Sequence, residues 1–310
     1  MKVLISSRSF GKINSEPIDA LKNAGFEVVV NPYNKKLDEG ELIELMGDAV
    51  GLIAGTEPIT ENVIKHAKAL KVISRYGVGL DNVDLDAAKK RGIEVYNTPN
   101  APAKAVAELT LSLILNLMRR IPESSQPMKD KIWQPQMGHS LYGKALGIIG
   151  LGRIGKELVK LVQPFNVDIF AYEKYPDDDF VASHNIRLGS LEDVLSQSDV
   201  VSIHLPLMEE TRNIISVKEL SFMKHNSVLI NTARGGLVDE DALISVLKEG
   251  TIAGAAFDAF ENEPYTGELL KLSNVLLTPH IGTYTEETRM IMEMETVENL
   301  IKVLSGVVVK

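Results

Sequence analysis

Residues 145–155, ALGIIGLGRIG, carry the strongest signal of fold class in the chain. The first half of this segment, Ala145–Ile149, is a short apolar run of the kind that forms a buried strand in a parallel sheet. Its second half carries glycines at positions 150, 152 and 155 and leads into a helical pattern at Gly155–Val162. The spacing alone is a weak signal. A strand before it and a helix after it, however, are the context of a dinucleotide-binding turn, where the backbone approaches a pyrophosphate at a helix N-terminus.

An acidic residue lies where such a turn needs one. The next predicted strand, Asp168–Tyr172, is followed by Glu173. A carboxylate about twenty residues beyond the glycines, at the end of the second strand, binds the ribose hydroxyls of adenosine in dinucleotide-binding folds. The alternative is an ordinary glycine-rich turn with a solvated Glu. Strand, glycines, helix and acid together favour the dinucleotide site.

The same alternation of strand and helix extends outward in both directions. Toward the N-terminus, strands are predicted at Val3–Ile5, Val28–Val30, Gly51–Ala54, Lys71–Ser74 and Val95–Asn97. Helical patterns lie between them at Glu16–Ala24, Glu39–Met46, Glu61–Ala67 and Asp86–Arg91. Toward the C-terminus, strands are predicted at Asp168–Tyr172, Val200–His204, Ser227–Asn231, Ala253–Asp258 and Val275–Leu277, with a last helix at Glu286–Leu304. The two series predict an α/β protein with two Rossmann-like or flavodoxin-like lobes on parallel sheets.

A long apolar helix and a segment without clear periodicity lie between the two series. Ala103–Arg120 is a helical pattern that is apolar nearly all round, so we expect it to be buried between domains or between subunits. Pro122–Tyr142 is rich in Pro, Gln, Met and Gly and contains the single tryptophan, Trp133. We expect this segment to be irregular.

Length and composition limit the possible functions. The 310 residues can bury a sizeable core, and 45% hydrophobic with 24% charged residues is an ordinary globular balance. The absence of cysteine excludes disulfides, thiolate metal sites and cysteine nucleophiles, and it fits a cytoplasmic protein. A net charge of −9 disfavours nucleic acid as a partner. The sequence shows no signal peptide, no membrane span and no metal-ligand spacing among its six histidines.

Polar residues follow three strands of the second series, where an open α/β sheet binds its ligands. Arg234, in NTARGG at 231–236, suits bidentate capture of a carboxylate, although a surface arginine in a turn is an equal alternative. The acids of DAFENEP at 258–264 follow the next strand, and His280 of TPHIG at 278–282 follows the last. A lone histidine is more often structural than catalytic. A histidine beside an acid at a neighbouring strand end is a candidate general acid.

A glycine-rich loop also follows a strand of the first series. In SRYGVGLDNVD, residues 74–84, the backbone amides around Gly77 and Gly79 can bind a carboxylate. The alternative is a plain turn before a helix that Asp84 caps.

Taken together, these motifs resemble the D-isomer-specific 2-hydroxyacid dehydrogenases, and the resemblance covers nearly the whole chain. The matching segments are Arg75–Asp84, Asn97–Pro99, Ala105–Glu108, Gly147–Gly155, His204–Leu207, Asn231–Asp239, Asp258–Pro264 and Thr278–Gly282. Within the family the chain resembles the short 3-phosphoglycerate dehydrogenase-like members that lack a C-terminal regulatory domain. The resemblance implies an NAD-dependent oxidoreductase that moves a hydride to or from C2 of a small D-2-hydroxy acid or 2-keto acid.

The resemblance also implies a role for each matching residue. Arg234 would clamp the substrate carboxylate and polarise the C2 carbonyl, and His280, paired with Glu263, would be the general acid or base. The full set implied for the cofactor NAD is Gly150, Gly152, Arg153, Ile154, Gly155, Glu173, His204, Pro206, Thr211, Thr232, Ala233, Asp258, His280 and Gly282. The set implied for the substrate is Arg75, Tyr76, Gly77, Val78, Gly79, Asn97, Arg234 and, by position after the first strand, Arg8.

The family fold predicts how the chain divides. Residues 1–98 with 287–310 would form the substrate-binding domain, residues 99–286 the NAD-binding Rossmann domain, and the active site the cleft between them. Relatives pair through the cofactor domain, so a homodimer is expected, without a nucleic-acid or membrane partner.

Two departures from the family pattern leave alternatives open. Glu173 stands where many relatives have Asp, and the neighbouring Lys174 leaves room for NADP. Members acting on phosphoglycerate often carry an Arg in the loop after the third strand, whereas residues 54–58 read AGTEP here. Arg8 is the possible substitute. The resemblance therefore allows 3-phosphoglycerate and 3-phosphohydroxypyruvate, and equally a glyoxylate or hydroxypyruvate reductase.

Two rival functions use the same fold. One is an NAD-sensing, corepressor-like binding protein, which fold alone does not exclude. The other is an enzyme that oxidises a different anion, such as formate or phosphonate. Retention of Arg234, Glu263 and His280 favours catalysis over sensing.

Overall fold

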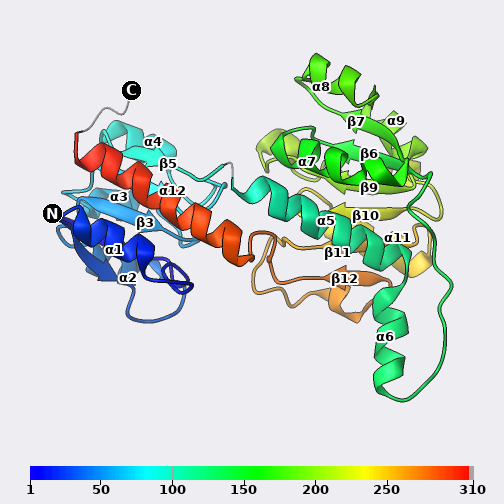
Figure 1. Cartoon of the computed structure of the whole chain (residues 1–310), viewed down its shortest axis with the longest axis horizontal. Coiled ribbons are helices and arrows are strands. Elements are labelled where there is room, and N and C mark those ends of the chain that lie inside the picture. Colours follow the sequence, from blue (N-terminus) through cyan, green and yellow to red (C-terminus); the bar gives the residue numbers. More distant parts are fainter. Residues whose placement is uncertain (100, 307–310) are drawn as a thin grey trace. The chain divides into compact units, whose positions relative to one another are not determined.

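The computed structural model describes residues 1–99 and 101–306; Asn100 and residues 307–310 of the predicted domains lie outside the described part. The chain forms two compact units (Figure 1). Unit 1 comprises residues 1–102 and the chain from Tyr284 onward, and unit 2 comprises Ala103–Thr283. Each unit is described by itself.

Unit 1 is built on a five-stranded parallel sheet. Its strands are β1 (Lys2–Ile5), β2 (Glu27–Val30), β3 (Gly51–Ala54), β4 (Val72–Arg75) and β5 (Glu94–Tyr96), in the order β2-β1-β3-β4-β5. Its helices are α1 (Glu16–Asn23), α2 (Glu39–Met46), α3 (Glu61–His66), α4 (Leu85–Lys90) and α12 (Glu286–Leu304). The strand order reverses at β1, so the loops after β1 and β3 leave the sheet in opposite directions, which is where such sheets bind ligands.

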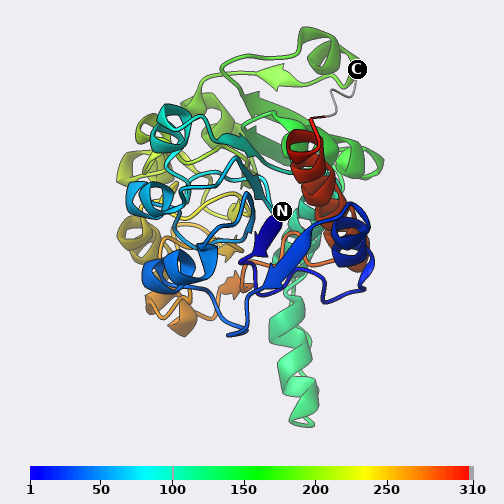
Figure 2. The same ribbon diagram turned by 90° about the vertical axis from the view of Figure 1, so that its left-hand side faces the viewer.

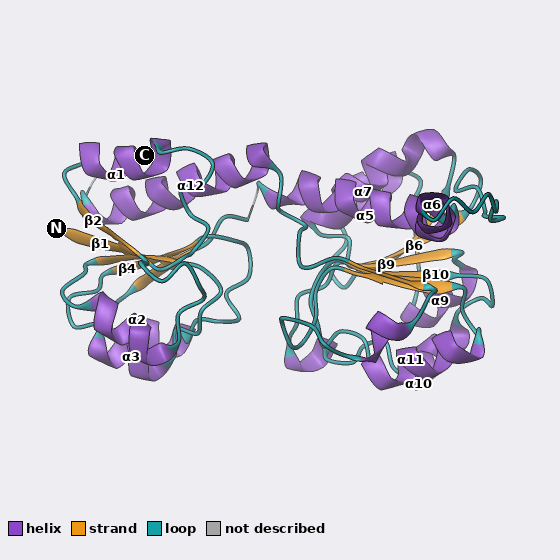
Figure 3. Ribbon diagram, turned by 90° about the horizontal axis from the view of Figure 1, so that it is seen from below, coloured by secondary structure: helices purple, strands orange, loops and turns teal. Residues whose placement is uncertain are grey.

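Alternating side chains bury both faces of this sheet. Val3 and Ile5 of β1 pack in the cluster that includes Met292 and Leu300 of α12, whereas Leu4, between them, packs with α2 and α3. Figure 3 shows the same arrangement, with α1 and α12 on one face and α2 and α3 on the other. A strand buried on both faces must be apolar throughout, which is why these runs are continuous.

Unit 2 is built on a seven-stranded parallel sheet. Its strands are β6 (Ala145–Ile149), β7 (Asp168–Tyr172), β8 (Arg187–Leu188), β9 (Val200–Ile203), β10 (Val228–Asn231), β11 (Gly254–Phe257) and β12 (Val275–Leu277), in the order β12-β11-β10-β9-β6-β7-β8. Helices α7 (Arg153–Val162), α8 (Asp178–Ser183), α9 (Leu191–Gln197), α10 (Val217–Phe222) and α11 (Glu240–Glu249) connect them. The order reverses between β6 and β9, beside the glycine turn.

Helices cover both faces of this second sheet. In Figure 3, α5 (Pro102–Met118) and α7 lie on one face, and α9, α10 and α11 lie on the other. The fold class predicted from the sequence, two α/β lobes on parallel sheets, is confirmed. The two-residue β8 was not predicted, because two residues carry no periodicity.

The prediction for Pro122–Tyr142 was wrong in its first part. Residues Ile121–Lys129 form a helix, α6, which Figures 1 and 2 show standing clear of the sheet of unit 2. Pro122 lies in the first turn of this helix, where a missing N–H breaks no hydrogen bond, so it starts the helix instead of preventing it. Residues 130–142 contain no helix or strand, as predicted.

Two further observations concern function classes. Within the described residues, no helix has the length and apolar character needed to cross a membrane. Among the same residues, no three His, Asp or Glu side chains gather in a group that could hold a metal ion.

Candidate active site

The glycine turn of unit 2 is shaped by close approach of the backbone. Gly150 has φ +96°, and a Cβ there would lie 2.9 Å from the carbonyl oxygen of His204 at the end of β9. A Cβ on Gly155 would lie 2.5 Å from the carbonyl oxygen of Gly150. Glycine is therefore required at both positions, the first for its φ and the second for the close contact of α7 with the turn.

The N-terminus of α7 is open. Gly152 is the N-cap residue and offers no side-chain cap, and a Cβ built on it meets no heavy atom within 4 Å. Arg153 and Ile154 are the first helical residues. The uncapped N–H groups of this turn can therefore bind an anion such as a pyrophosphate, and the positive end of the helix dipole favours it.

Glu173, directly after β7, is held against the same turn. Its Oε2 accepts a hydrogen bond from the Leu151 amide at 2.7 Å, and its Oε1 accepts one from the Tyr175 amide at 2.9 Å. Both bonds fix the carboxylate beside the glycine turn, at the position predicted for binding ribose hydroxyls. The ammonium of the neighbouring Lys174 lies over the Tyr175 ring, 5.4 Å from its centroid.

His204 follows β9, and only one of its two ring nitrogens has a hydrogen-bond partner among the described residues. Its Nε2 lies 2.9 Å from Ser202 Oγ, and its Nδ1 is buried with no hydrogen-bond partner among the described residues. Burial lowers the pKa of His204 to about 4, so the ring is neutral at physiological pH. In the segment after it, Thr211 Oγ1 donates to the Pro206 carbonyl at 2.7 Å and thereby holds that turn.

The end of β10 is fixed by local hydrogen bonds. Asn231 Oδ1 accepts from the Ala233 amide at 3.0 Å, and Asn231 Nδ2 donates to the Arg234 carbonyl at 2.8 Å. Thr232 Oγ1 lies 2.8 Å from Thr110 Oγ1 of α5, which ties the loop to that helix. Asn231 therefore positions the backbone from which Arg234 projects.

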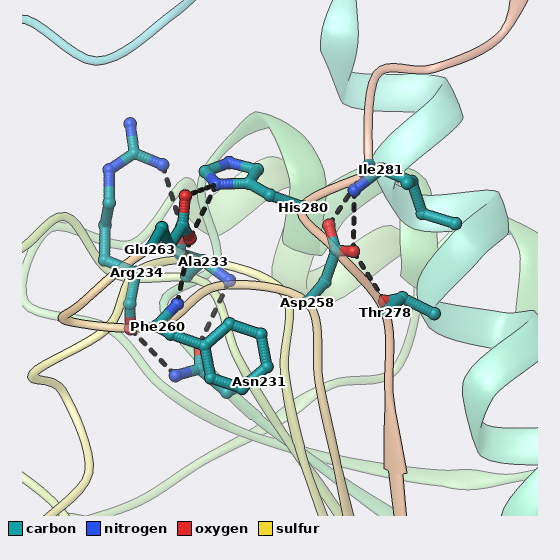
Figure 4. Close-up of polar contacts among 10 residues, drawn as sticks. Asn231, Ala233, Arg234, Asp258, Phe260, Glu263, Thr278, His280 and Ile281 are labelled. Carbon is teal, nitrogen blue, oxygen red and sulfur yellow. Dashed lines mark hydrogen bonds and ion pairs between the residues drawn. The ribbon is translucent and has the colours of Figure 1, made fainter. Parts of the chain in front are cut away.

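Arg234 stands at the edge of this loop (Figure 4). Its Nη1 donates to the Ala233 carbonyl at 2.8 Å, which directs the guanidinium out from the strand end. A side chain on Gly235 would collide with the backbone of Phe260 and Glu261, so the loop after Arg234 packs directly on the loop after β11. The charge of Arg234 helps to lower the pKa of Glu263.

His280 and Glu263 form a hydrogen-bonded pair (Figure 4). His280 Nδ1 lies 2.9 Å from Glu263 Oε1 and 3.0 Å from Oε2, and both side chains are partly exposed. Burial raises the pKa of Glu263, but the hydrogen bond and charge of His280 outweigh burial and leave that pKa below its ordinary value. Glu263 is therefore ionised at neutral pH. His280 has φ +55°, a region that few non-glycine residues adopt and that is enriched at functional sites.

Asp258 lies beside this pair but is closed off (Figure 4). Its Oδ1 accepts from Thr278 Oγ1 at 2.5 Å and from the Ile281 amide at 2.8 Å, and its Oδ2 accepts from the Gly282 amide at 2.8 Å. The residue is 1% exposed. Burial raises the pKa of Asp258 against the opposing effect of these three hydrogen bonds. The three bonds fix the segment that carries His280.

In unit 1, the side chain of Arg75 folds over the glycine loop that follows β4. Gly77 has φ +145°, and the Arg75 guanidinium curls back over it to donate to the Tyr76 carbonyl. Asn97 Nδ2 donates to the Val78 carbonyl at 2.6 Å, and the Thr98 amide donates to the Gly77 carbonyl at 3.0 Å. These bonds use the carbonyl groups of the loop.

The other two predicted substrate residues of unit 1 differ in their surroundings. Tyr76 is 4% exposed, whereas Arg8, after β1, is exposed and takes part in none of the described hydrogen bonds or ion pairs. The loop after β3 turns its acid inward: Glu57 is 2% exposed and accepts hydrogen bonds from Ser6 Oγ and, at 2.8 Å, from the Gly55 amide.

The structure thus brings together, within unit 2, the predicted residues at the ends of β6, β7, β9, β10, β11 and β12. Three residues were not assigned a role from the sequence: Asn231, which orients the Arg234 loop; Glu57, which joins the loops of β1 and β3; and Arg289 in α12. For Asn231 the signal was its position at a strand end before Arg234. For Arg289 no local signal existed, because Ser9 and Tyr76, two of its partners, lie far away in the chain.

Comparison with known proteins tests the resemblance. Residues 111–282 match the family model described as D-isomer specific 2-hydroxyacid dehydrogenase, NAD binding domain. A D-3-phosphoglycerate dehydrogenase of Methanocaldococcus jannaschii is 39% identical over 312 residues, covering 99% of this chain and 58% of that protein. A glyoxylate reductase of Thermococcus litoralis is 41% identical over 292 residues, covering 91% of this chain and 88% of that protein.

A solved structure agrees with both. The crystal structure of a Thermus thermophilus protein matches with a TM-score of 0.91 at 38% identity, covering 99% of this chain and 97% of that one. This chain spans a little over half the length of the phosphoglycerate dehydrogenase and most of the glyoxylate reductase. The family predicted from the motifs is confirmed: the chain belongs to the D-isomer-specific 2-hydroxyacid dehydrogenases.

Proposed function

We propose that this protein is an NAD-dependent oxidoreductase that transfers a hydride between the cofactor and C2 of a small D-2-hydroxy acid or 2-keto acid. The observation that carries the proposal is the His280–Glu263 pair, with Nδ1 to Oε1 at 2.9 Å, at strand ends of the unit that carries the glycine turn. A binding protein that only senses NAD has no need of a paired, partly exposed histidine. Turnover of any 2-keto acid by the purified protein separates the enzyme from the sensor.

The residues around the glycine turn fit a dinucleotide. Gly150, Gly152 and Gly155 leave the N–H groups of α7 open, and Glu173, held against the turn by the Leu151 amide, would bind the ribose hydroxyls. The remaining residues that would hold NAD are Arg153, Ile154, His204, Pro206, Thr211, Thr232, Ala233, His280 and Gly282. Asp258, also implied by the resemblance, would act through the Thr278–Gly282 segment, because that segment already occupies its carboxylate. Bound there, the nicotinamide supplies or accepts the hydride.

Arg234 is proposed to bind the carboxylate of the substrate. The guanidinium offers two parallel N–H groups, which match a carboxylate in geometry and charge. Asn231 and the close packing of Gly235 hold the loop, so the backbone that carries Arg234 loses little conformational entropy on binding. Within unit 1, the amides of Gly77–Gly79, which the Arg75 guanidinium partly covers, are proposed as carboxylate-binding groups.

His280 is proposed to move the proton. In reduction, oxygen at C2 gains negative charge, and a protonated imidazole supplies the proton through Nε2 because Nδ1 is bonded to Glu263. In oxidation, the neutral ring takes the hydroxyl proton through the same atom. Ionised Glu263 orients the ring and stabilises its positive charge.

The substrate is proposed to be a small 2-keto acid. The names of the relatives divide between a phosphoglycerate dehydrogenase and reductases of glyoxylate and hydroxypyruvate. In this chain the loop after β3 carries the inward-facing Glu57 instead of an arginine, which favours the unphosphorylated substrates. A panel of 3-phosphohydroxypyruvate, hydroxypyruvate, glyoxylate and pyruvate, assayed by NADH absorbance, tests this. Formate and phosphonate, assayed with NAD, test the rival oxidations.

NAD is proposed over NADP because Glu173 would face a 2′-phosphate with a negative charge. A close charge clash that is partly shielded from water costs a few kcal/mol. The kcat/KM for NADH should exceed that for NADPH by at least about tenfold. Equal values for the two cofactors would contradict this assignment.

A homodimer is proposed through unit 2. Helix α6 has nine residues, none of them buried, and a helix of this length is marginal in water without packing. Exposed apolar side chains gather in and after it: Ile121, Met128, Ile132, Trp133 and Met137, with Trp133 at 83% and Met137 at 89% exposure. We propose that the same segment of a second copy covers this surface. A cytoplasmic location is proposed as well, because the sequence has no cysteine. Light scattering at micromolar concentration should give a mass of two chains, and Trp133→Ser should weaken the dimer.

A further inference from the structure

Arg289, in the first turns of α12, is enclosed by two aromatic rings of unit 1. Its guanidinium carbon lies 4.3 Å from the centroid of the Tyr76 ring and 4.7 Å from that of the Tyr284 ring. Its Nη2 donates a hydrogen bond of 2.5 Å to Ser9 Oγ. The planar guanidinium thus makes two cation–π contacts and one hydrogen bond at once.

These partners come from three different segments of the chain. Ser9 belongs to the loop after β1, Tyr76 follows β4, and Tyr284 is the residue at which the chain re-enters unit 1. Arg289 is therefore the point where two loops at the carboxyl edge of this sheet meet the start of α12.

Tyr76 passes this contact on to the glycine loop. Its ring is also bounded edge-on by Phe10, at 5.4 Å between centroids, and its hydroxyl donates to Glu293 at 3.0 Å. Tyr76 is 4% exposed, and the next residue is Gly77, the first of the amides proposed for the substrate carboxylate. Packing and the bonded hydroxyl hold the Tyr76 ring in one position. Loss of a contact that holds the ring should therefore also displace the loop that follows Tyr76.

We propose that Arg289 is a positioning residue for substrate binding: it fixes the loop after β1 and the Tyr76–Gly79 loop in the arrangement that receives the substrate carboxylate. The inference rests on the proposed function only for its kinetic consequence. It assigns Arg289 no contact with substrate or cofactor.

The first experiment compares Arg289→Met, Arg289→Lys and Ser9→Ala by steady-state kinetics with the best 2-keto acid of the panel. Arg289→Met keeps an unbranched chain but loses the cation, and we expect a rise in KM of about tenfold with kcat and the Kd for NADH within about threefold. Arg289→Lys should give an intermediate KM, because an ammonium can lie on one ring but has no planar surface for two. Ser9→Ala should have the smallest effect, since it removes only the hydrogen bond.

A matched control exists in unit 2. Arg187 lies 5.2 Å from the Phe170 ring and bonds to Asp168 at 3.0 Å, so it is also an arginine on an aromatic ring. Arg187→Met should leave KM and kcat unchanged. Loss of folded protein in any variant would lower apparent kcat without raising KM, so the KM measurement separates positioning from instability.

The second experiment reads the loops without turnover. Hydrogen exchange should become faster in Arg289→Met over residues 6–10 and 76–80 and stay unchanged over 150–155 and over the strands of both sheets. If the wild-type protein reduces no 2-keto acid, the proposed function fails, and this exchange pattern still decides the role of Arg289. An unchanged KM, or an increase in exchange spread over all of unit 1, would overturn the inference.

Discussion

Asp258 and Glu263 lie five residues apart after the same strand and share the neighbour His280, yet their surroundings are opposite. Asp258 is buried, accepts three hydrogen bonds from the segment Thr278–Gly282, and has a raised pKa. Glu263 is partly exposed, accepts from His280 and from the Phe260 amide, and has a lowered pKa. Residue type alone does not separate the two carboxylates; burial and partners do.

The two carboxylates of this loop therefore have different roles. Asp258 uses its oxygens to hold the backbone on which His280 stands, so it has little capacity left for proton transfer. Glu263 contacts the imidazole itself and stays ionised, so it is placed to accept the Nδ1–H of the ring. The predictions below remove each carboxylate, or the histidine between them, to test this division.

Removal of the histidine should have the largest effect. His280→Ala should lower kcat about 10²–10⁴-fold, the usual contribution of a positioned acid–base group. The Kd for NADH should change little, because the glycine turn and Glu173 are untouched. Stopped-flow and steady-state assays with the best keto acid give both numbers. A wild-type kcat would show that another group moves the proton.

Asp258→Asn should destabilise the protein and misplace His280. With its oxygen at the Oδ1 position the asparagine keeps two of the three hydrogen bonds, but its amide group then faces the N–H of Gly282, donor against donor. An unsatisfied buried group of this kind costs about 1–3 kcal/mol of unfolding free energy. Urea unfolding measures it, with Thr278→Val as the matched variant that removes one bond only. Unchanged stability together with a lost pH dependence of kcat would assign proton transfer to Asp258 instead.

Glu263→Gln should shift the pH dependence of turnover. Reduction needs protonated His280 and falls as pH rises, whereas oxidation needs the neutral ring and rises. Without the ionised partner the protonated ring loses its hydrogen-bonded carboxylate, so the falling limb of reduction should move to lower pH. Replacing both residues should cost much less than the sum of the two separate losses, since they serve one step. If the falling limb of reduction lay at the same pH in wild type and in Glu263→Gln, His280 and Glu263 would not act as a pair.

Stability should respond to pH in opposite directions at the two carboxylates, and this is the smallest effect. The folded-state pKa of Glu263 is lowered, so its stabilisation is present above its unfolded pKa and lost as pH falls through the folded pKa. The folded-state pKa of Asp258 is raised, so its contribution is lost as pH rises through that value. The advantage of wild type over Glu263→Gln should therefore shrink by a few tenths of a kcal/mol on acidification, the size left after solvent screening. The advantage over Asp258→Asn should grow. The same sign for both would refute the contrast.

Local patterns in the sequence were enough to predict the fold class and to name most residues of the candidate site. Continuous apolar runs and amphipathic helices are local signals, and they predicted every strand except β8, and helices α1 to α5, α7 and α12, to within two residues. The carboxyl ends of parallel strands meet at one edge, so Arg234, Glu263 and His280 could be grouped from the order of the strands alone. The glycines at 150 and 155 were identified for the same reason, because a tight turn and a close contact each demand glycine locally.

Features that depend on partners far away in the chain became visible only in the folded structure. It showed that Asp258 is closed by three hydrogen bonds while Glu263 is open, a difference set by the fold of residues 278–282. It placed Pro122, in a segment expected to be irregular, in the first turn of α6. It also placed Arg289 between Tyr76 and Tyr284, with Ser9 280 residues away. Periodicity cannot encode such contacts, since burial and hydrogen bonding at one residue depend on which distant side chains the packed core brings beside it.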